Sequence, residues 1–172
     1  NIVTQDNGGV KIDNAEKLRG DVLDQLILNA VLNPSAEIKG LSRFLIKSAA
    51  QELGIVTSSI QGLYDARGRG EVKGFTVPAL NIRGLPYELC RAIFRTAIKT
   101  NAGAFIFELA KSEMGYTFQK PQELSTVILA AAIKEGFSGP VFIQGDHFQV
   151  NAKNYALDPD KEIAGLKELI KN

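Results

Sequence analysis

The sequence predicts an α/β protein in which parallel strands alternate with helices, preceded by a helical segment. After residue 70, three short and almost continuously apolar runs are each followed by an amphipathic helical pattern. Before residue 70, apolar residues recur only at helical spacing. Repeated strand–helix units require crossover connections, which pair the strands in parallel. We therefore divide the chain into an N-terminal helical segment, residues 1–70, and three βα units, residues 71–172.

The composition is that of a globular protein. Of the 172 residues, 45% are hydrophobic and 23% charged, and 20 basic residues balance 19 acidic ones. The chain has no like-charge block typical of nucleic-acid binding, no signal peptide, and no apolar run of about 18 residues. We expect a cytoplasmic protein without a nucleic-acid or membrane partner. The single cysteine, Cys90, lies on an apolar helix face and is expected to be a packed thiol.

Three helices are expected before residue 70. The first covers 14–33 and the second 35–54, where Ser35 can cap the start and Gly54 can end the helix. A shorter third helix is expected from residue 58 or 59. The buried stripe of the second helix is expected to contain Ile38, Leu41, Leu45, Ala49 and Leu53. Two glycines in the stretch 65–70 then end the segment.

The three βα units follow in order. Strands are expected at 75–80, 104–109 and 140–144, and helices at 86–101, 121–136 and 159–170. Pro78 lacks a backbone N–H, so it is expected at an irregular or unpaired position. The buried face of the last helix is expected to contain Ile163, Leu166, Leu169 and Ile170.

This pattern leaves two architectures, an open doubly wound sheet and part of an eight-stranded (β/α) barrel. The first βα turn, 81–84, lacks the glycine fingerprint of a dinucleotide-binding fold. A complete barrel needs about 250 residues, so under that interpretation the chain is a fragment. In either architecture, ligands bind outside the carboxyl ends of the strands. The residues expected there are Asn81, Glu108 to Ser112, Asp146 and His147.

Asp146 and His147 form the main candidate site. A histidine can be a metal ligand or a general base near neutral pH, and an adjacent carboxylate can transfer a proton. The two side chains can face a metal and a substrate only if the backbone turns between them, and Gly145 would allow such a turn. His147 is the only histidine and the chain has no cysteine pair, so further zinc ligands must come from outside this chain.

Other strand-end residues have more ordinary interpretations. Glu108 is expected to pair with Arg83 or Lys111 rather than to act in catalysis. Tyr116 and Phe118 are as well explained by an aromatic cover over the strand ends as by contact with a ligand.

With these residues placed, the stretch from about Gly74 to Asn151 resembles the class II, metal-dependent ketose-bisphosphate aldolases and the related tagatose-bisphosphate aldolase subunits. Residues 75–81, with the sequence FTVPALN, are similar to the opening strand of that family. Residues 104–108, AFIFE, are similar to its second strand, and 112–116, SEMGY, to the serine-containing loop after it. Residues 140–147, PVFIQGDH, are similar to the third strand with its Asp-His pair.

The resemblance implies a (β/α)₈ TIM barrel, of which this chain holds the first three units. It implies that His147 is a ligand of Zn²⁺ or another divalent metal, and that Asp146 is the acid/base at the cleaved carbon–carbon bond. Asn81 and Ser112 would contact the substrate, although Ala110 can also be aligned with the family serine. In such enzymes the metal polarises the substrate ketone as a Lewis acid.

The implied function is cleavage of a ketose 1,6-bisphosphate, of the fructose or tagatose type, to dihydroxyacetone phosphate and glyceraldehyde 3-phosphate. This lyase reaction belongs to glycolysis and carbohydrate metabolism, and the enzyme is expected to be a homo-oligomer. The 172-residue chain alone is expected to be inactive. One alternative is a non-catalytic barrel subunit that supports a tagatose-bisphosphate aldolase. Another is a doubly wound binding domain that is complete at this length.

Overall fold

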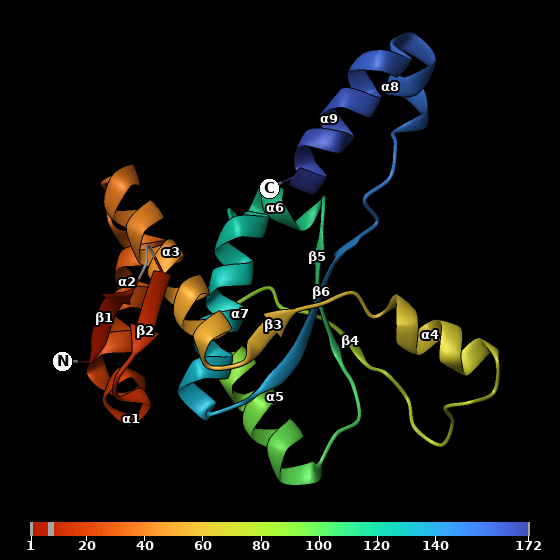
Figure 1. Ribbon diagram of the computed structural model, residues 1–172. Helices are drawn as coiled ribbons and strands as arrows, with labels where there is room; N and C mark the ends of the chain where they lie inside the picture. Colours follow the sequence, from red (N-terminus) through yellow and green to blue (C-terminus); the bar gives the residue numbers. More distant parts are fainter. Residues whose placement is uncertain (1, 7–8, 172) are drawn as a thin grey trace.

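The main feature of the fold is a parallel sheet, described in a computed structural model that covers residues 2–6 and 9–171. Its strands are β3 (Ile55–Thr57), β4 (Ala79–Asn81), β5 (Ile106–Ala110) and β6 (Gly139–Asp146). They lie in the order β3-β6-β5-β4, and all three neighbouring pairs are parallel (Figure 1). The predicted α/β class and parallel pairing are confirmed.

Helices cover one face of this sheet in two layers. α5 (Pro86–Thr100) and α7 (Pro121–Glu135) pack against the sheet and against each other. α2 (Leu23–Leu32) and α3 (Ala36–Glu52) lie on the outer side of α7 (Figure 1). Because α7 is enclosed by the sheet and by other helices, the run 126–133 within it is entirely buried. The main hydrophobic core therefore surrounds α7.

The N-terminal segment is less regular than expected. It begins with a hairpin of β1 (Val3–Asp6) and β2 (Gly9–Ile12), and its first helix is divided into α1 (Ala15–Lys17), the π-helical turn η1 (Leu18–Val22) and α2. The break occurs at Gly20, whose ψ of −145° is not helical. In α3, Ser35 caps the start as predicted, but the expected buried stripe is wrong in part. Ile38 and Leu41 are exposed, while Ser42 and Ile46 are buried.

Strand β3 was not expected from the sequence. It follows α3 directly and pairs with residues 139–141, at the start of β6. Residues 1–70 therefore contribute to the same sheet, and through α2 and α3 to the same core, as residues 71–172. Beyond Ser58, whose N–H donates to the Val141 carbonyl at 3.0 Å, β3 no longer accompanies β6. The carboxyl half of β6 is thus paired only with β5 within the described residues.

The first strand of the βα units is shorter than predicted. It begins at Ala79 rather than at residue 75. Pro78 lies just outside it, where its carbonyl accepts a hydrogen bond from the Ile106 N–H at 2.9 Å. The expected irregular or unpaired position is confirmed in that Pro78 lies outside the strand, and its nitrogen, which cannot donate, is not needed for strand pairing.

The opposite face of the sheet is only partly covered. α4 (Gln61–Gly68) lies over it, and Ile60 and Leu63 pack there with Ile106 and Phe142 in a second, smaller core (Figure 1). The predicted third helix corresponds to α4. Toward the carboxyl ends of the strands, this face carries polar side chains instead.

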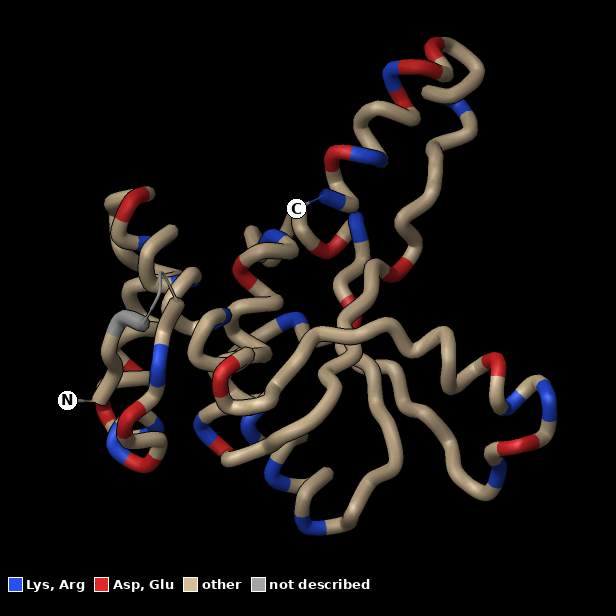
Figure 2. The backbone as a smooth tube through the Cα atoms, in the orientation of Figure 1, with Lys and Arg blue, Asp and Glu red and all other residues tan. Residues whose placement is uncertain are grey.

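The last part of the chain projects from the sheet. After β6, α8 (Ala152–Leu157) and α9 (Pro159–Lys171) form a helical hairpin that returns toward α6 (Glu113–Thr117) (Figure 1). The predicted buried face of α9 is wrong: no described residue of α9 is buried, and Ile170 is exposed. Figure 2 shows Lys and Arg interspersed with Asp and Glu along the chain. Of the helices in the described residues, none has both the length and the apolar character needed to cross a bilayer.

Cys90 is a packed thiol, as predicted. It lies on the buried side of α5 in the main core, and burial raises the pKa of the thiol to about 12. A thiol with such a pKa stays protonated and is a poor nucleophile at neutral pH.

Candidate functional site at the carboxyl ends of the strands

Polar side chains gather on one face of the sheet where β4, β5 and β6 end. The register aligns Asn81 with Glu108 and Glu108 with Gln144, and it aligns Ala110 with Asp146. Side chains alternate between the two faces of a strand, so Asn81, Glu108, Gln144 and Asp146 share one face. Their neighbours Leu80, Phe107 and Ile143 pack into the core on the other face.

The structure brings Asn81 and Asp146 together. The Asn81 amide nitrogen donates to a carboxylate oxygen of Asp146 at 3.2 Å and to one of Glu113 at 3.3 Å. Asn81 and Asp146 are 65 residues apart in sequence, yet they become neighbours because parallel strands end at the same edge. This contact links two of the four predicted site residues.

His147 lies directly beside Asp146, but the turn differs from the prediction. Gly145 belongs to β6, and the left-handed residue is His147 itself, with a φ of 53°. The expected turn at Gly145 is therefore wrong. The turn at His147 is closed by a hydrogen bond from the Gln149 N–H to the His147 carbonyl at 2.9 Å. The imidazole folds back so that its Nε2 lies 3.5 Å from an Asp146 oxygen, with the side chain 76% exposed.

Gly145 is needed for a different reason. A Cβ at this position would lie 2.5 Å from ring atoms of Phe148, which covers the glycine. The Phe148 ring thus packs directly on β6 at Gly145, immediately before Asp146 and His147. Glycine permits this contact because it has no side chain.

We expect Gly145→Ala to lower the free energy of unfolding by about 1 kcal/mol, because the Phe148 ring must leave its seat. Gly165→Ala is the matched control, since a Cβ at Gly165 in α9 meets nothing within 4 Å. In that helix alanine is expected to stabilise by up to about 1 kcal/mol. Urea unfolding followed by circular dichroism measures both changes. Equal effects of the two substitutions would contradict the contact.

Ser112 does not join the cluster. It precedes α6, its side chain is exposed, and it makes no capping hydrogen bond. Within the described residues, no hydrogen bond links its hydroxyl to Asn81 or Asp146. Ala110, the alternative alignment for the family serine, is buried at the end of β5 opposite Asp146.

Glu113 is the part of the site that the sequence did not reveal. Its side chain is 3% exposed, and it accepts hydrogen bonds from Asn81, from the Ala110 N–H at 3.1 Å and from Nε of Arg83. Burial by itself raises the pKa of this carboxyl, but the three donors and the Arg83 charge outweigh it and hold the pKa below its usual range. No spacing or motif distinguishes Glu113 from the other acids of the chain. Only folding brings its donors to one point.

The lowered pKa of Glu113 predicts a pH-dependent contribution to stability. An ionised carboxylate that is better stabilised in the folded state contributes fully above its unfolded pKa of about 4.5, and this contribution is lost as the pH falls through the folded pKa. The difference in free energy of unfolding between the wild type and Glu113→Gln should therefore be largest near pH 7 and shrink below pH 4.5. Urea unfolding across pH 7 to 3 measures this difference. A difference in free energy of unfolding that stays constant from pH 7 to 3 would contradict the lowered pKa of Glu113.

Glu108 has a different partner from the one expected. It accepts a hydrogen bond from the Gln144 amide, whereas Arg83 pairs with Glu113 and Lys111 lies 3.9 Å from Glu162. The predicted pairing of Glu108 with Arg83 or Lys111 is wrong.

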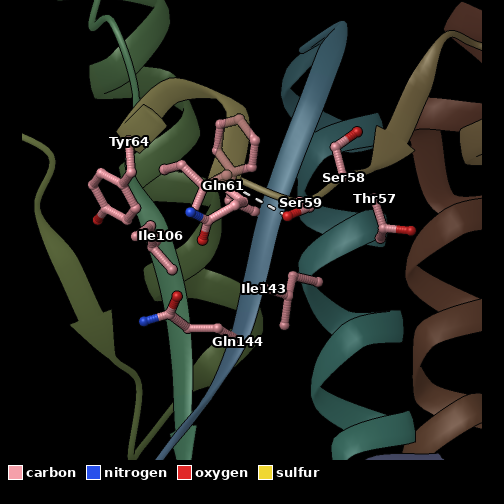
Figure 3. Close-up of a pocket in the computed structure, with 10 residues that line it drawn as sticks. Thr57, Ser58, Ser59, Gln61, Tyr64, Ile106, Ile143 and Gln144 are labelled. Carbon is pink, nitrogen blue, oxygen red and sulfur yellow. Dashed lines mark hydrogen bonds between the residues drawn. The ribbon is translucent and has the colours of Figure 1, made fainter. Parts of the chain in front are cut away.

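A cavity of about 520 Å³ lies on the same face of the sheet, nearer the amino ends of the strands. The side chains of Gln144 and Ile106 line it from the sheet, and Gln61 and Tyr64 line it from α4 (Figure 3). Gln144 is two residues before Asp146, a separation of roughly 7 Å along a strand. The cavity therefore lies beside the Asn81–Asp146 pair without including it.

The described side chains around Asp146 do not supply a full set of zinc ligands. Zinc sites in proteins use three or four protein ligands. Among the described residues, no group of three His, Cys, Asp or Glu side chains is placed to hold a metal ion. In the described part of the chain, His147 and Asp146 thus offer at most part of a zinc site.

Comparison with family models, with curated proteins and with solved structures gives no match to this chain.

Proposed function

We propose that this chain forms the first three βα units of a metal-dependent ketose-bisphosphate aldolase. The observation that carries the proposal is the hydrogen bond between Asn81 and Asp146 at the strand ends, with the exposed His147 ring beside it. The aldolase resemblance assigns these three residues to substrate binding, proton transfer and metal binding. His147 follows Asp146 directly, whereas Asn81 is 65 residues away from Asp146, so the meeting of Asn81 with this pair at one strand edge supports a common role.

In this proposal, Asp146 handles the proton at the cleaved carbon–carbon bond. One of its oxygens is held by the Asn81 amide and the other faces the imidazole of His147, so the carboxylate is oriented from both sides. Asn81 donates to Asp146 and to Glu113, which leaves its carbonyl oxygen to accept a hydrogen bond from a substrate hydroxyl. A positioned carboxylate of this kind is a general acid/base.

The barrel is part of the same proposal. β4, β5 and β6 are neighbours in chain order, as the first three strands of a (β/α)₈ barrel are. The short strand β3 accompanies only the start of β6, so the carboxyl half of that edge is left for a further strand. The remaining metal ligands are proposed to come from segments outside this chain. Ser112, which precedes α6, is proposed as a second substrate contact.

The test is an assay of the full-length protein that carries this sequence. We expect cleavage of fructose or tagatose 1,6-bisphosphate that is lost with a chelator and restored by Zn²⁺, and we expect His147→Ala to abolish zinc binding. The 172-residue chain alone is expected to show no cleavage. Activity that survives chelation, or no cleavage of either sugar, would overturn the proposal.

A second candidate is a non-catalytic barrel subunit that supports a tagatose-bisphosphate aldolase. It is compatible with the same donor set, because the described residues hold no group of three metal ligands. This candidate predicts that the full-length protein lacks cleavage activity but raises the activity or solubility of a separate aldolase subunit when the two are produced together.

A further inference from the structure

Arg83 lies on the candidate site but has no role in the proposed function. It follows Asn81 by two residues, in the loop between β4 and α5. The residue between them, Ile82, is buried in the main core. Asn81 and Arg83 instead both reach Glu113, so they project to the face that carries Asp146. The Arg83 guanidinium is thus placed beside the Asn81–Asp146 pair.

The ion pair between Arg83 and Glu113 is asymmetric. The Glu113 side chain is 3% exposed, whereas the Arg83 side chain is 59% exposed. Glu113 is itself held by the Ala110 N–H and by Asn81, so it forms a rigid support beneath the arginine. The bond to Glu113 uses Nε of Arg83, which is the inner end of the guanidinium. The Tyr116 hydroxyl also interacts with the guanidinium, and more than half of the Arg83 side chain faces solvent.

An exposed guanidinium fixed at its inner end is suited to an oxyanion. Guanidinium N–H groups form paired hydrogen bonds with phosphate or carboxylate oxygens, and fixing the group in advance reduces the entropy lost on binding. Glu113, through its hydrogen bond and its charge, raises the pKa of Arg83, so the group stays protonated. Asp146 and Glu108, deeper on the sheet face, would repel an anion there. The anion is therefore restricted to the outer side of Arg83.

We propose that Arg83, supported by Glu113, binds a phosphate group of the substrate beside Asn81. The oxyanion-binding site at Arg83 follows from the geometry, while its assignment to a sugar phosphate rests on the proposed aldolase function. Lys111, on the loop after β5, is a second partly exposed cation, but it is paired with Glu162 at 3.9 Å.

The chain contains a matched control in Arg95. Its side chain is 60% exposed and it pairs with the largely buried Glu135, so its charge and exposure equal those of Arg83. It lies nine residues after the start of α5, which corresponds to about 14 Å along the helix from the strand ends. If the anion bound to any exposed arginine, replacing Arg83 and replacing Arg95 would lower its affinity equally.

The test is a titration of the 172-residue chain, in the presence of a chelator, with inorganic phosphate, dihydroxyacetone phosphate and uncharged dihydroxyacetone. Isothermal titration calorimetry gives the affinities, and the NMR signals of the arginine Nε–H groups give the location. Arg83→Ala alone would leave Glu113 buried without its cation. The informative variants are therefore Arg83→Lys and the double change Arg83→Ala with Glu113→Gln, compared with Arg95→Ala.

We expect both phosphates to bind and dihydroxyacetone not to bind. The double variant should lose at least about tenfold in phosphate affinity, Arg83→Lys should lose less, and Arg95→Ala should be unchanged. No saturable binding, unchanged binding in the double variant, or an equal loss in Arg95→Ala would overturn the proposal. Arg83-dependent binding in a protein without cleavage activity would refute the aldolase function and leave the oxyanion-binding site intact. Cleavage by the full-length protein that is unaffected by changes at Arg83 would support the aldolase function and refute the phosphate site at Arg83.

Discussion

Phe94→Ala is expected to lower the free energy of unfolding by about 3–5 kcal/mol, which is the usual cost of removing a fully buried phenylalanine. Phe94 is fully buried in α5 at the centre of an aromatic cluster. Its ring centroid lies 5.7 Å from that of Phe105, 5.3 Å from that of Phe107 and 4.9 Å from that of Phe137. The substitution removes these contacts and leaves a cavity between α5, β5 and the turn before β6.

Such a loss is a large part of the total stability of a domain, which is typically about 5–15 kcal/mol. Urea unfolding followed by far-ultraviolet circular dichroism measures it. Phe44→Ala is the matched control, because Phe44 lies on the exposed side of α3 and its removal is expected to change stability by about 0.5 kcal/mol or less. A cost below about 1 kcal/mol for Phe94→Ala would show that α5 does not pack on the sheet as described.

Under the proposed aldolase function, Asp146→Asn is expected to lower kcat of the full-length protein by about 10²–10⁴-fold, the usual contribution of a general acid/base. Asparagine has nearly the same shape as aspartate, and its carbonyl oxygen can still accept the hydrogen bond from Asn81. The fold and the binding of substrate should therefore be preserved while proton transfer is lost. Steady-state cleavage kinetics, with separate values of kcat and KM, measure the effect.

Glu108→Gln is the control for this experiment. Glu108 is a carboxylate on the same sheet face, but it is engaged by the Gln144 amide, not by Asn81. We expect its replacement to change kcat by less than about threefold, because its charge is not placed at the proposed proton-transfer position. A large loss with Glu108→Gln and a small one with Asp146→Asn would reverse the assignment of the acid/base.

The sequence was sufficient to predict the positions of the long helices. α3, α5, α7 and α9 lie where apolar periodicity and capping residues place them, because these signals are local. It failed for short elements such as β3, α6 and α8, which are too brief for a periodic pattern. It also failed for the buried face of α9, because a helix with an apolar stripe is buried only where another surface meets it.

For the candidate site, the sequence indicated the right strand ends but not the contacts between them. Asn81, Asp146 and His147 were each found from their position after an apolar run, and the structure places them together. The partners of Glu113 come from residues 81, 83 and 110, and nothing in the local sequence links these positions. The ion pair between Arg83 and Glu113 depends on which loops meet, and this is set by the sheet order.

By itself, the sequence determined the α/β class, the parallel pairing of the strands and the sheet edge that carries polar residues. These features depend on local periodicity and on short connections between successive elements. Only the tertiary structure decided the order β3-β6-β5-β4 and the support of Arg83 by Glu113. Each of these depends on contacts between distant segments.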